Sequence, residues 1–281
     1  MNYDHQYHAG NAADCIKHLA LFLTLEALTR KTSPLAYIDT HAGAGLYPLG
    51  STGEHLQGIL RLWGERRSLP YSGAWLKRIA ELNHGKSQMH YPGSPLLAAT
   101  ILRPTDRIVL FEQKPDVATQ LRKNIGKRAH TSILQEDGYR TLFAQIPPVE
   151  KRGLVLIDPP FERRDEWEVL ADSLIRAYQR WPQGTYLIWY PIKIRGTITR
   201  FWQTIRARIP AFVCELTQMP EEGREQLFGS GLMLVNAPWG LKEALSAGLT
   251  ELGPLLTAPQ PGGFWSLRCL NWPGPEKKPP H

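Results

Sequence analysis

Four consecutive residues, Asp158-Pro159-Pro160-Phe161, have the chemistry needed to hold an amino group on a planar ring. Such a nitrogen is a poor nucleophile because its lone pair is delocalised into the ring. The Asp158 carboxylate and the Pro159 carbonyl would each accept one N–H and so aim the lone pair outward. The prolines stiffen the loop, and Phe161 would stack on the ring. The motif therefore predicts catalysis on such a group; the alternative is a turn that only closes a strand.

Three other motifs follow apolar runs in the same way. The loop 39–45 (DTHAGAG) is rich in small residues that let a ligand approach the backbone, and His41 would touch the ligand or cap local backbone. Glu112 is placed to accept both hydroxyls of a ribose. Asp137 would accept an adenine amino group, with Gly138 leaving room for the ring. This order, followed by Asp-Pro-Pro-Phe, is typical of an S-adenosylmethionine-dependent amino methyltransferase.

The N-terminal segment adds polar residues whose role the sequence leaves open. Tyr3 and His5 precede the first helical stretch, where they would form an arm that closes over a base or a frayed terminus. Asp14 would cap the start of that helix. Lys17 and His18 interrupt an otherwise apolar pattern. Both have a functional interpretation, against which stand a solvent-facing Lys17 and a hydrogen-bonded core His18.

Two further motifs follow the same reasoning. Ser94 lies in Pro92-Gly93-Ser94-Pro95, ahead of an apolar helical run, and is expected to cap that helix. The helix N-terminus would present N–H groups to the methionine carboxylate of the donor. The segment Asn236-Ala237-Pro238-Trp239 resembles the Asp158 motif but has alanine in place of the first proline. We expect it to end an edge strand and not to form a second catalytic site.

Short apolar runs alternate with helical stretches along most of the chain. The runs that predict strands are residues 35–39, 107–112, 132–136, 154–158, 185–190, 212–218 and 232–236. The stretches that predict helices are residues 13–30, 114–127, 138–145, 165–181 and 197–208. This alternation predicts an α/β fold with a mainly parallel, seven-stranded, doubly wound sheet. The last two strands have only a turn-rich link between them, so we expect them to form an antiparallel pair at one edge.

Residues 46–92 break this alternation and show no convincing strand pattern. They contain helix-like pieces at 56–66 and 72–82, and six Lys and Arg residues against three Glu give a net charge of +3. We expect a small helical insertion subdomain there, within a methyltransferase domain of residues 1–45 and 93–270. The proline-rich residues 271–281 are expected to be a flexible tail.

The overall charge favours an anionic partner. The chain has 281 residues with 42% hydrophobic residues, which excludes general disorder, and a formal net charge of +7. Five basic residues and no acidic ones fall in 193–208, and Arg163-Arg164 directly follow the Asp158 motif. These residues would hold phosphates; the alternative is an ordinary solvated helix face.

Cysteine usage and hydropathy indicate the cellular compartment of the protein. The three cysteines form no CxxC pair, so a thiolate zinc site and disulfides are both unexpected, which suits a reducing cytosol. The N-terminal residues open polar, unlike a signal peptide. No stretch reaches the ~18 apolar residues that span a bilayer. We therefore expect a cytoplasmic protein.

The resemblance of these motifs to a known family is closer than fold class. The N-terminal pattern Y-x-H-x-Y-H-A-G-N-x-A-D-x-x-K-H, with D-T-H-A-G-A-G, Y-P-G-S-P and L-I-D-P-P-F, resembles the ribosomal RNA large subunit methyltransferase J family. The resemblance runs from Tyr3 to about Trp239. Enzymes of this family make N6-methyladenine in 23S ribosomal RNA.

The resemblance implies a Rossmann-like class I methyltransferase that uses S-adenosylmethionine. It implies Asp158 as the catalytic acceptor, supported by Pro159, Phe161 and Lys17. Tyr3 and His5, together with Lys17, would lie near the target adenine. The implied cofactor-binding residues are His18, His41, Ser94, Glu112, Asp137 and Gly138.

The resulting hypothesis is methyl transfer from S-adenosylmethionine to N6 of one adenine in 23S ribosomal RNA. The enzyme would be a cytoplasmic monomer that requires neither a metal nor a membrane. The alternatives are an enzyme that methylates adenine N6 in DNA or a glutamine side chain, and a catalytically silent RNA-binding protein on the same scaffold. No DNA-reading domain is recognisable, which favours RNA. Intact Asp158, Glu112 and Asp137 argue against a silent scaffold, and a nicotinamide dehydrogenase would need a GxGxxG loop.

Overall fold

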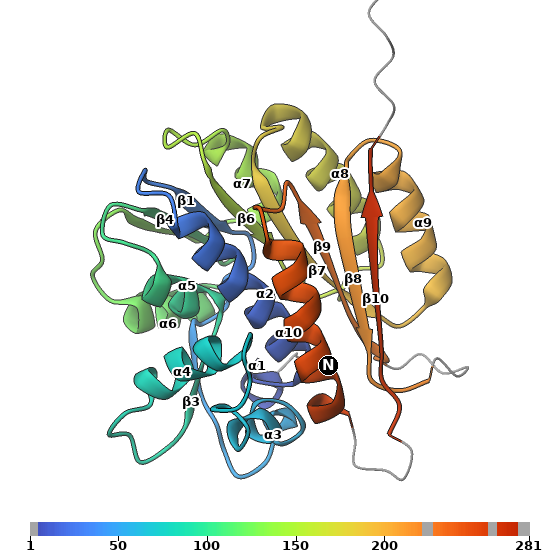
Figure 1. Cartoon of the computed structure of the whole chain (residues 1–281). Coiled ribbons are helices and arrows are strands. Elements are labelled where there is room, and N and C mark those ends of the chain that lie inside the picture. The colour runs from blue at the N-terminus through green and yellow to red at the C-terminus, as the bar shows by residue number, and fades with distance from the viewer. Residues whose placement is uncertain (1–4, 221–226, 258–262, 275–281) are drawn as a thin grey trace, which may run out of the picture.

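An eight-stranded sheet with strand order β10-β8-β9-β7-β6-β1-β4-β5 forms the centre of the molecule (Figure 1). The structure is a computed structural model that describes residues 5–220, 227–257 and 263–274. The strands are β1 (Ala36–Asp39), β4 (Arg107–Phe111), β5 (Thr131–Leu134), β6 (Gly153–Ile157), β7 (Thr185–Ile192), β8 (Ala211–Thr217), β9 (Gly229–Val235) and β10 (Ser266–Trp272). Strands β7, β6, β1, β4 and β5 run parallel, whereas β9, β8 and β10 pair antiparallel.

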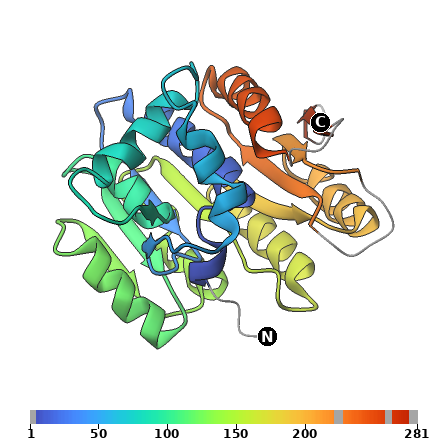
Figure 2. The same cartoon turned by 90° about the horizontal axis from the view of Figure 1, so that it is seen from below.

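Helices cover both faces of this sheet. The helices of the main layers are α2 (Ala12–Thr29), α5 (Ser94–Ile101), α6 (Pro115–Ile125), α7 (Gly138–Gln145), α8 (Glu166–Arg180), α9 (Arg195–Arg206) and α10 (Leu241–Leu256). Helices α2, α5, α6 and α10 contribute to one apolar core, and α7, α8 and α9 to the other. Figure 2 shows the sheet between these two layers.

Strand β6 is buried on both faces of the sheet. All five of its residues, GLVLI, are buried. Successive side chains of a strand point to opposite faces, so Leu154 and Leu156 join the core under α2, while Val155 and Ile157 join the core under α8. The residue after the strand, Asp158, therefore emerges at the carboxyl end of the sheet, where the other parallel strands also end.

The predicted α/β class and mainly parallel sheet are confirmed, but the sheet has eight strands where seven were expected. The last two predicted strands do pair antiparallel, as β8 and β9. The sheet then continues to β10, which includes residues 271 and 272 of the predicted tail. Only its last residue is buried and the others are exposed or partly buried, so its sequence lacks a continuous apolar run.

Helix α10 was also missed. Its sequence, LKEALSAGLTELGPLL, includes Gly248, Gly253 and Pro254, residues that disfavour helices. The helix nevertheless buries Leu245, Leu249 and Leu252 completely in the core it shares with α2. Tertiary burial thus outweighs the poor intrinsic propensity of this segment.

The predicted insertion contains short helices but begins and ends with short strands. Residues 46–92 contain β2 (Leu46–Pro48), the 3-10 helix η1 (Glu54–Gln57), α3 (Ile59–Trp63), α4 (Gly73–Leu82) and β3 (His90–Pro92). Strands β2 and β3 pair antiparallel and bring the two ends of the insertion together. The insertion lies at the end of the molecule where the short α1 (His5–His8) also lies (Figure 1).

The expectation of no disulfide is wrong. Cys214 on β8 and Cys269 on β10 are directly opposite in the antiparallel register and form a disulfide, with Cα atoms 4.2 Å apart. The two cysteines are 55 residues apart in sequence and belong to no local motif. Their proximity depends on the pairing of β10, which the sequence did not predict. Cys15 is free and buried.

Candidate active site

The centre of the site is an ion cluster in which one lysine contacts two aspartates. The Lys17 Nζ on α2 lies 2.5 Å from Asp158 Oδ2 and 2.8 Å from Asp14 Oδ1. The Lys17 side chain is only 12% exposed and that of Asp158 only 14%. Lys17 therefore does not face solvent, which excludes the structural alternative considered for it. Because α2 packs across β6 and β7, it presents Lys17 to the end of β6.

The charges in this cluster influence one another. Burial raises the pKa of Asp158 above its ordinary value, although the neighbouring Lys17 ammonium lowers it in part. Burial acts to lower the pKa of Lys17, but Asp14 and Asp158 outweigh it and raise that pKa. Burial also acts against ionisation of Asp14, yet Lys17 keeps the pKa of Asp14 below its ordinary value. Lys17 is thus held as the cation between the two aspartates.

The loop after β6 holds Phe161 beside two tryptophans. Phe161 has a φ of 52°, in the left-handed region that a bulky residue rarely adopts. Its ring centroid lies 4.8 Å from that of Trp167 and 5.9 Å from that of Trp189. Phe161 is half-buried, so part of the ring remains accessible. The backbone thus holds this ring at the strand end next to Asp158.

Trp189 is a site residue that the sequence did not single out. In the β6–β7 register Ile157 lies opposite Ile188, which places Trp189 beside Asp158 on the neighbouring strand. The Lys17 Nζ lies 5.8 Å from the centroid of the Trp189 ring. Only the register of the two strands, which a single sequence does not reveal, would have identified it.

The loop after β1 lies next to Asp158 on the same sheet edge. Its backbone is tied to both neighbouring strands, because Thr40 N–H donates to the Leu156 carbonyl and Ala42 N–H to the Phe111 carbonyl. Gly43 and Gly45 have φ values of 63° and 79°, which favour glycine. The predicted small-residue loop therefore turns sharply between β6 and β4.

Asp39, the last residue of β1, forms hydrogen bonds beneath this loop and was not predicted as a site residue. Its buried carboxylate accepts hydrogen bonds from the hydroxyls of Tyr37 and Ser94, both at 2.7 Å, and from the His41 N–H at 3.2 Å. Burial raises its pKa to about 6. Ser94 is therefore not the expected cap: Gly93 occupies the N-cap position of α5, and Ser94 begins the helix and bonds Asp39.

Two histidines of the site are held neutral. His18 Nδ1 lies 2.8 Å from the Tyr91 hydroxyl, so His18 is a hydrogen-bonded core residue at one end of the site. Burial lowers its pKa to about 3. His41 bonds the Thr40 hydroxyl at 2.8 Å and meets the Tyr139 ring edge-on, and burial lowers its pKa to about 4. The structural alternative for His18, a hydrogen-bonded core histidine, is thus realised. His41 bonds a side-chain hydroxyl and, among the described residues, does not cap the backbone.

Two acidic residues follow the next strands. Glu112, after β4, accepts the Gly43 N–H at 3.0 Å and the Lys114 N–H at 2.8 Å. Asp137, after β5, caps α7 through its Oδ1, which accepts the Tyr139 N–H at 2.9 Å. A Cβ on Gly138 would lie 2.1 Å from the Thr40 carbonyl oxygen. The room that we assigned to a ligand ring at Gly138 is therefore taken by the chain's own backbone.

The remaining predicted residues lie in several places. Tyr3 lies outside the described residues, and His5 is the first residue of helix α1. Asn11, and not Asp14, caps α2, because Asn11 Oδ1 accepts the Asp14 N–H at 2.8 Å. Asn236 follows β9, which runs antiparallel to β7, so the segment with the exposed Trp239 lies at the opposite end of the sheet.

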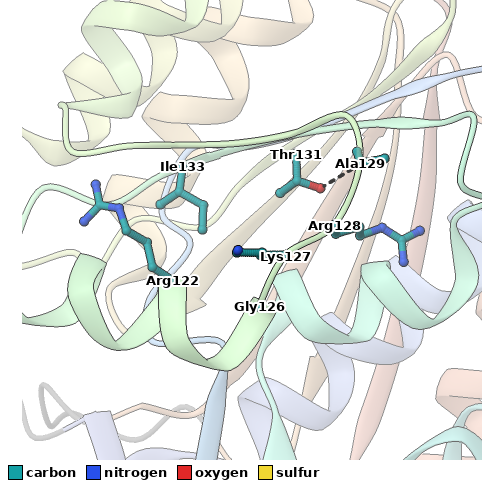
Figure 3. Close-up of a pocket in the computed structure, with 7 residues that line it drawn as sticks. All are labelled: Arg122, Gly126, Lys127, Arg128, Ala129, Thr131 and Ile133. Carbon is teal, nitrogen blue, oxygen red and sulfur yellow. Dashed lines mark hydrogen bonds between the residues drawn. The ribbon is translucent and has the colours of Figure 1, made fainter.

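The basic residues near the candidate site differ in how far they are exposed to solvent. Arg195 is 2.5 Å from the buried Glu215 and so has a structural partner, whereas Arg164 and Lys193 are exposed near the ends of β6 and β7. A separate hollow of about 550 Å³ has basic lining residues but lies before β5, away from the candidate site (Figure 3). Its lining residues are Arg122, Gly126, Lys127, Arg128, Ala129, Thr131 and Ile133.

Comparison with known proteins identifies the family. A sequence profile described as "Ribosomal RNA large subunit methyltransferase D, RlmJ" matches residues 32–269. The chain belongs to this family. It is 36% identical over 283 residues to the ribosomal RNA large subunit methyltransferase J of Haemophilus influenzae, covering 96% of this chain and 99% of that protein. The Escherichia coli protein of the same name is 36% identical over 254 residues, covering 88% and 90%.

Solved structures agree with this assignment. A crystal structure of a protein from Legionella pneumophila has a TM-score of 0.86 and 33% identity, covering 95% of this chain and 99% of that one. A probable spermidine synthase from Corynebacterium glutamicum, at a TM-score of 0.50 and 11% identity, covers 92% and 75% and shows the fold alone. The family predicted from the motifs is thus confirmed, and membership of this family makes the chain a methyltransferase.

Proposed function

We propose that this methyltransferase transfers a methyl group from S-adenosylmethionine to N6 of one adenine in 23S ribosomal RNA. The observation that carries the proposal is the largely buried Asp158 carboxylate, held by Lys17 at the carboxyl end of β6. It lies directly beside the loop that follows β1. Ligands of open α/β sheets bind at this edge. The names of the family and of its two curated relatives support ribosomal RNA as the substrate.

The side chains along this edge suit the chemical groups of S-adenosylmethionine. Each Glu112 oxygen accepts one backbone N–H and keeps a second lone pair for a ribose hydroxyl. Asp137 uses Oδ1 for capping, which leaves Oδ2 to accept an adenine N–H. His18, His41 and Ser94 would line the same donor site. When bound there, S-adenosylmethionine supplies a methyl group on a positively charged sulfur.

The Asp158 motif would prepare the target nitrogen. The Asp158 carboxylate and the Pro159 carbonyl each accept one hydrogen of the adenine amino group, so its lone pair points away from both acceptors. Phe161 stacks on the base, which offsets part of the cost of a few kcal/mol for unstacking it. Positioning of this kind accounts for much of catalysis when the reacting group is already activated.

Asp158 is also placed to receive a proton. Once the nitrogen carries the methyl group it must lose one of its two hydrogens, and the hydrogen bonded to Asp158 is the nearest to an acceptor. Burial raises the pKa of Asp158, so the carboxylate is a better proton acceptor than an exposed aspartate. The Lys17 ammonium remains protonated and favours the ionised form of Asp158 before the substrate binds.

The surface and the domain plan fit an RNA substrate. The net charge is +7, and Arg164 and Lys193 are exposed next to the site, where they would contact phosphates. Residues 46–92 would form a subdomain that helps to enclose the RNA. Tyr3 and His5 would approach the target adenine from the N-terminus. We propose a monomer that acts without a metal in the cytoplasm.

One observation concerns membranes. Within residues 5–220, 227–257 and 263–274, no helix has the length and apolar character required to cross a bilayer.

The test is mass mapping of methylated nucleosides in ribosomal RNA from cells that lack the protein. Loss of a single N6-methyladenine from 23S ribosomal RNA, restored by the parent chain and not by Asp158→Ala, is the expected result. Unchanged ribosomal RNA with loss of N6-methyladenine from DNA would favour the DNA alternative. Restoration by Asp158→Ala would favour a silent RNA-binding scaffold.

A further inference from the structure

Lys17 already donates to one oxygen of the carboxylate that the proposed reaction requires as an acceptor. Its Nζ donates to Asp158 Oδ2 at 2.5 Å, and no other hydrogen bond to the Asp158 carboxylate exists within the described part of the chain. The proposed function needs this carboxylate to accept an N–H from the substrate. The ammonium and the amino group therefore share one carboxylate, and a strong Lys17–Asp158 pair would weaken Asp158 as an acceptor.

Asp14 is the only second carboxylate that pairs with Lys17 in the described part of the chain. Asp14 Oδ1 lies 2.8 Å from Lys17 Nζ, three residues away on the same helix. Its other oxygen, Oδ2, accepts the Gly10 N–H at 2.9 Å. Asp14 is thus fixed from two sides, by its own helix and by the turn before it, and cannot follow Lys17 toward Asp158.

We propose that Asp14 is a positioning residue that draws the Lys17 ammonium away from Asp158 while the Asp158 carboxylate holds the substrate's amino group. This inference rests on the proposed function. Before substrate arrives, Lys17 bridges both carboxylates and keeps Asp158 ionised. When the amino group binds, Lys17 stays with Asp14, so its positive charge need not be left buried without a partner. Asp14 acts through Lys17 and touches no substrate atom.

Asp14 also connects the lysine to the N-terminal segment. The Asn11 amide donates to Glu54 Oε2 at 2.8 Å, and the same oxygen lies 2.9 Å from His8 Nδ1. Gly10, which bonds Asp14, lies between α1 and α2. The turn that Asp14 holds is therefore the turn that joins α1 to α2, the helix that carries Lys17.

A double-mutant cycle between Asp14→Asn and Lys17→Met tests this role. We expect Asp14→Asn to lower the methyl-transfer kcat by about 10- to 100-fold, because Lys17 then pairs with Asp158 alone. KM for S-adenosylmethionine should stay within about twofold of the parent. In the Lys17→Met background, Asp14→Asn should cause no further loss, because the residue it positions is absent. Additive losses would overturn the proposal.

The pH profile provides a readout that a purely structural role would not change. Asp14 is a negative charge that raises the pKa of Asp158, so its removal should move the acid limb of kcat to lower pH. Asp14→Glu restores the charge and should recover part of the activity. Asn11→Ala removes the α2 cap at the same turn; it should lower the melting temperature and leave the acid limb unmoved.

The outcomes separate failure of this inference from failure of the proposed function. If the parent chain methylates no ribosomal RNA, the proposed function fails before Asp14 is tested. If the parent is active and Asp14→Asn has the same kcat and the same acid limb as the parent, Asp14 has no positioning role. A loss in Asp14→Asn that Asn11→Ala reproduces, with the same acid limb, would likewise assign Asp14 to the turn alone.

Discussion

At the residue scale, the site depends on which partners its charged groups have. Asp158, Lys17 and Asp14 form one cluster, so each side chain fixes the protonation and direction of the others. The sequence predicted Asp158 from its own motif and Lys17 from the family resemblance. It assigned Asp14 to helix capping, because a single sequence does not show that an aspartate three residues from a buried lysine is that lysine's partner.

Glu112 provides a prediction about the donor. Replacing Glu112 with alanine removes the carboxylate proposed to accept the ribose hydroxyls. Loss of hydrogen bonds to a charged group costs about 1.5–3 kcal/mol, so we expect S-adenosylmethionine to bind about 10- to 100-fold more weakly by calorimetry. Glu136→Ala, which changes an exposed acid after the neighbouring strand, is the matched control. Equal affinity of Glu112→Ala and Glu136→Ala would show that the ribose is held elsewhere.

At the element scale, strand ends and one helix place the site. Strands β6, β1, β4 and β5 are parallel neighbours, so residues that follow them meet at one edge although they are far apart in sequence. Helix α2, which packs against one face of the sheet, contributes Lys17 and His18. The strand-end residues could be predicted because each follows an apolar run.

What could not be predicted depends on pairing between distant segments. Trp189 belongs to the site only through the register of β7 beside β6. The Cys214–Cys269 disulfide and the eighth strand depend on how β10 pairs with β8. Asp39 is recognisable as functional only when its three hydrogen-bond donors are known. In each case the deciding contact is absent from local sequence.

The buried His18 on helix α2 predicts that the fold loses stability in acid. In the unfolded chain a histidine gains a proton as the pH falls through about 6.5, whereas burial keeps the pKa of His18 at about 3 in the fold. Its stabilising effect is therefore complete above pH 6.5 and is lost progressively toward pH 3. Between pH 7 and pH 5 we expect His18 to account for about 2 kcal/mol of lost unfolding free energy.

Denaturant unfolding of His18→Gln without donor measures this contribution. Glutamine can still bond Tyr91 but takes up no proton, so the variant should lose about 2 kcal/mol less than the parent over this pH range. Asp39 works in the opposite direction, since its pKa is raised to about 6, but it is unchanged between the two proteins. His84→Gln, at an exposed position, should behave like the parent. Identical pH dependence of His18→Gln and parent would contradict the assignment.

At the scale of the whole molecule, the sheet has two ends with different roles. The carboxyl ends of the parallel strands hold the candidate site, beside the insertion and α1 (Figure 1). The opposite end also has basic residues, including those of the hollow before β5 (Figure 3). Net charge alone therefore does not tell which end meets RNA, whereas the position of Asp158 does.

Salt dependence distinguishes the two ends. Each phosphate contact contributes about 0.7–0.9 to the slope of log affinity against log salt. The double variant Arg164→Gln/Lys193→Gln should therefore bind ribosomal RNA with a slope that is shallower by about 1.4–1.8. The matched variant Arg122→Gln/Lys127→Gln, which removes the same charge before β5, should keep the parent slope. The reverse pattern would place the RNA at the other end of the sheet.

The central claim is that the Asp158 carboxylate holds the adenine amino group during transfer. Single-turnover methyl transfer from S-adenosylmethionine to ribosomal RNA by Asp158→Ala tests it, with donor affinity measured on the same preparation and Glu162→Ala as the neighbouring exposed control. We expect the rate to fall by at least about 10²-fold, while donor affinity and the rate of Glu162→Ala match the parent. An Asp158→Ala protein that transfers methyl groups at the parent rate would contradict the claim.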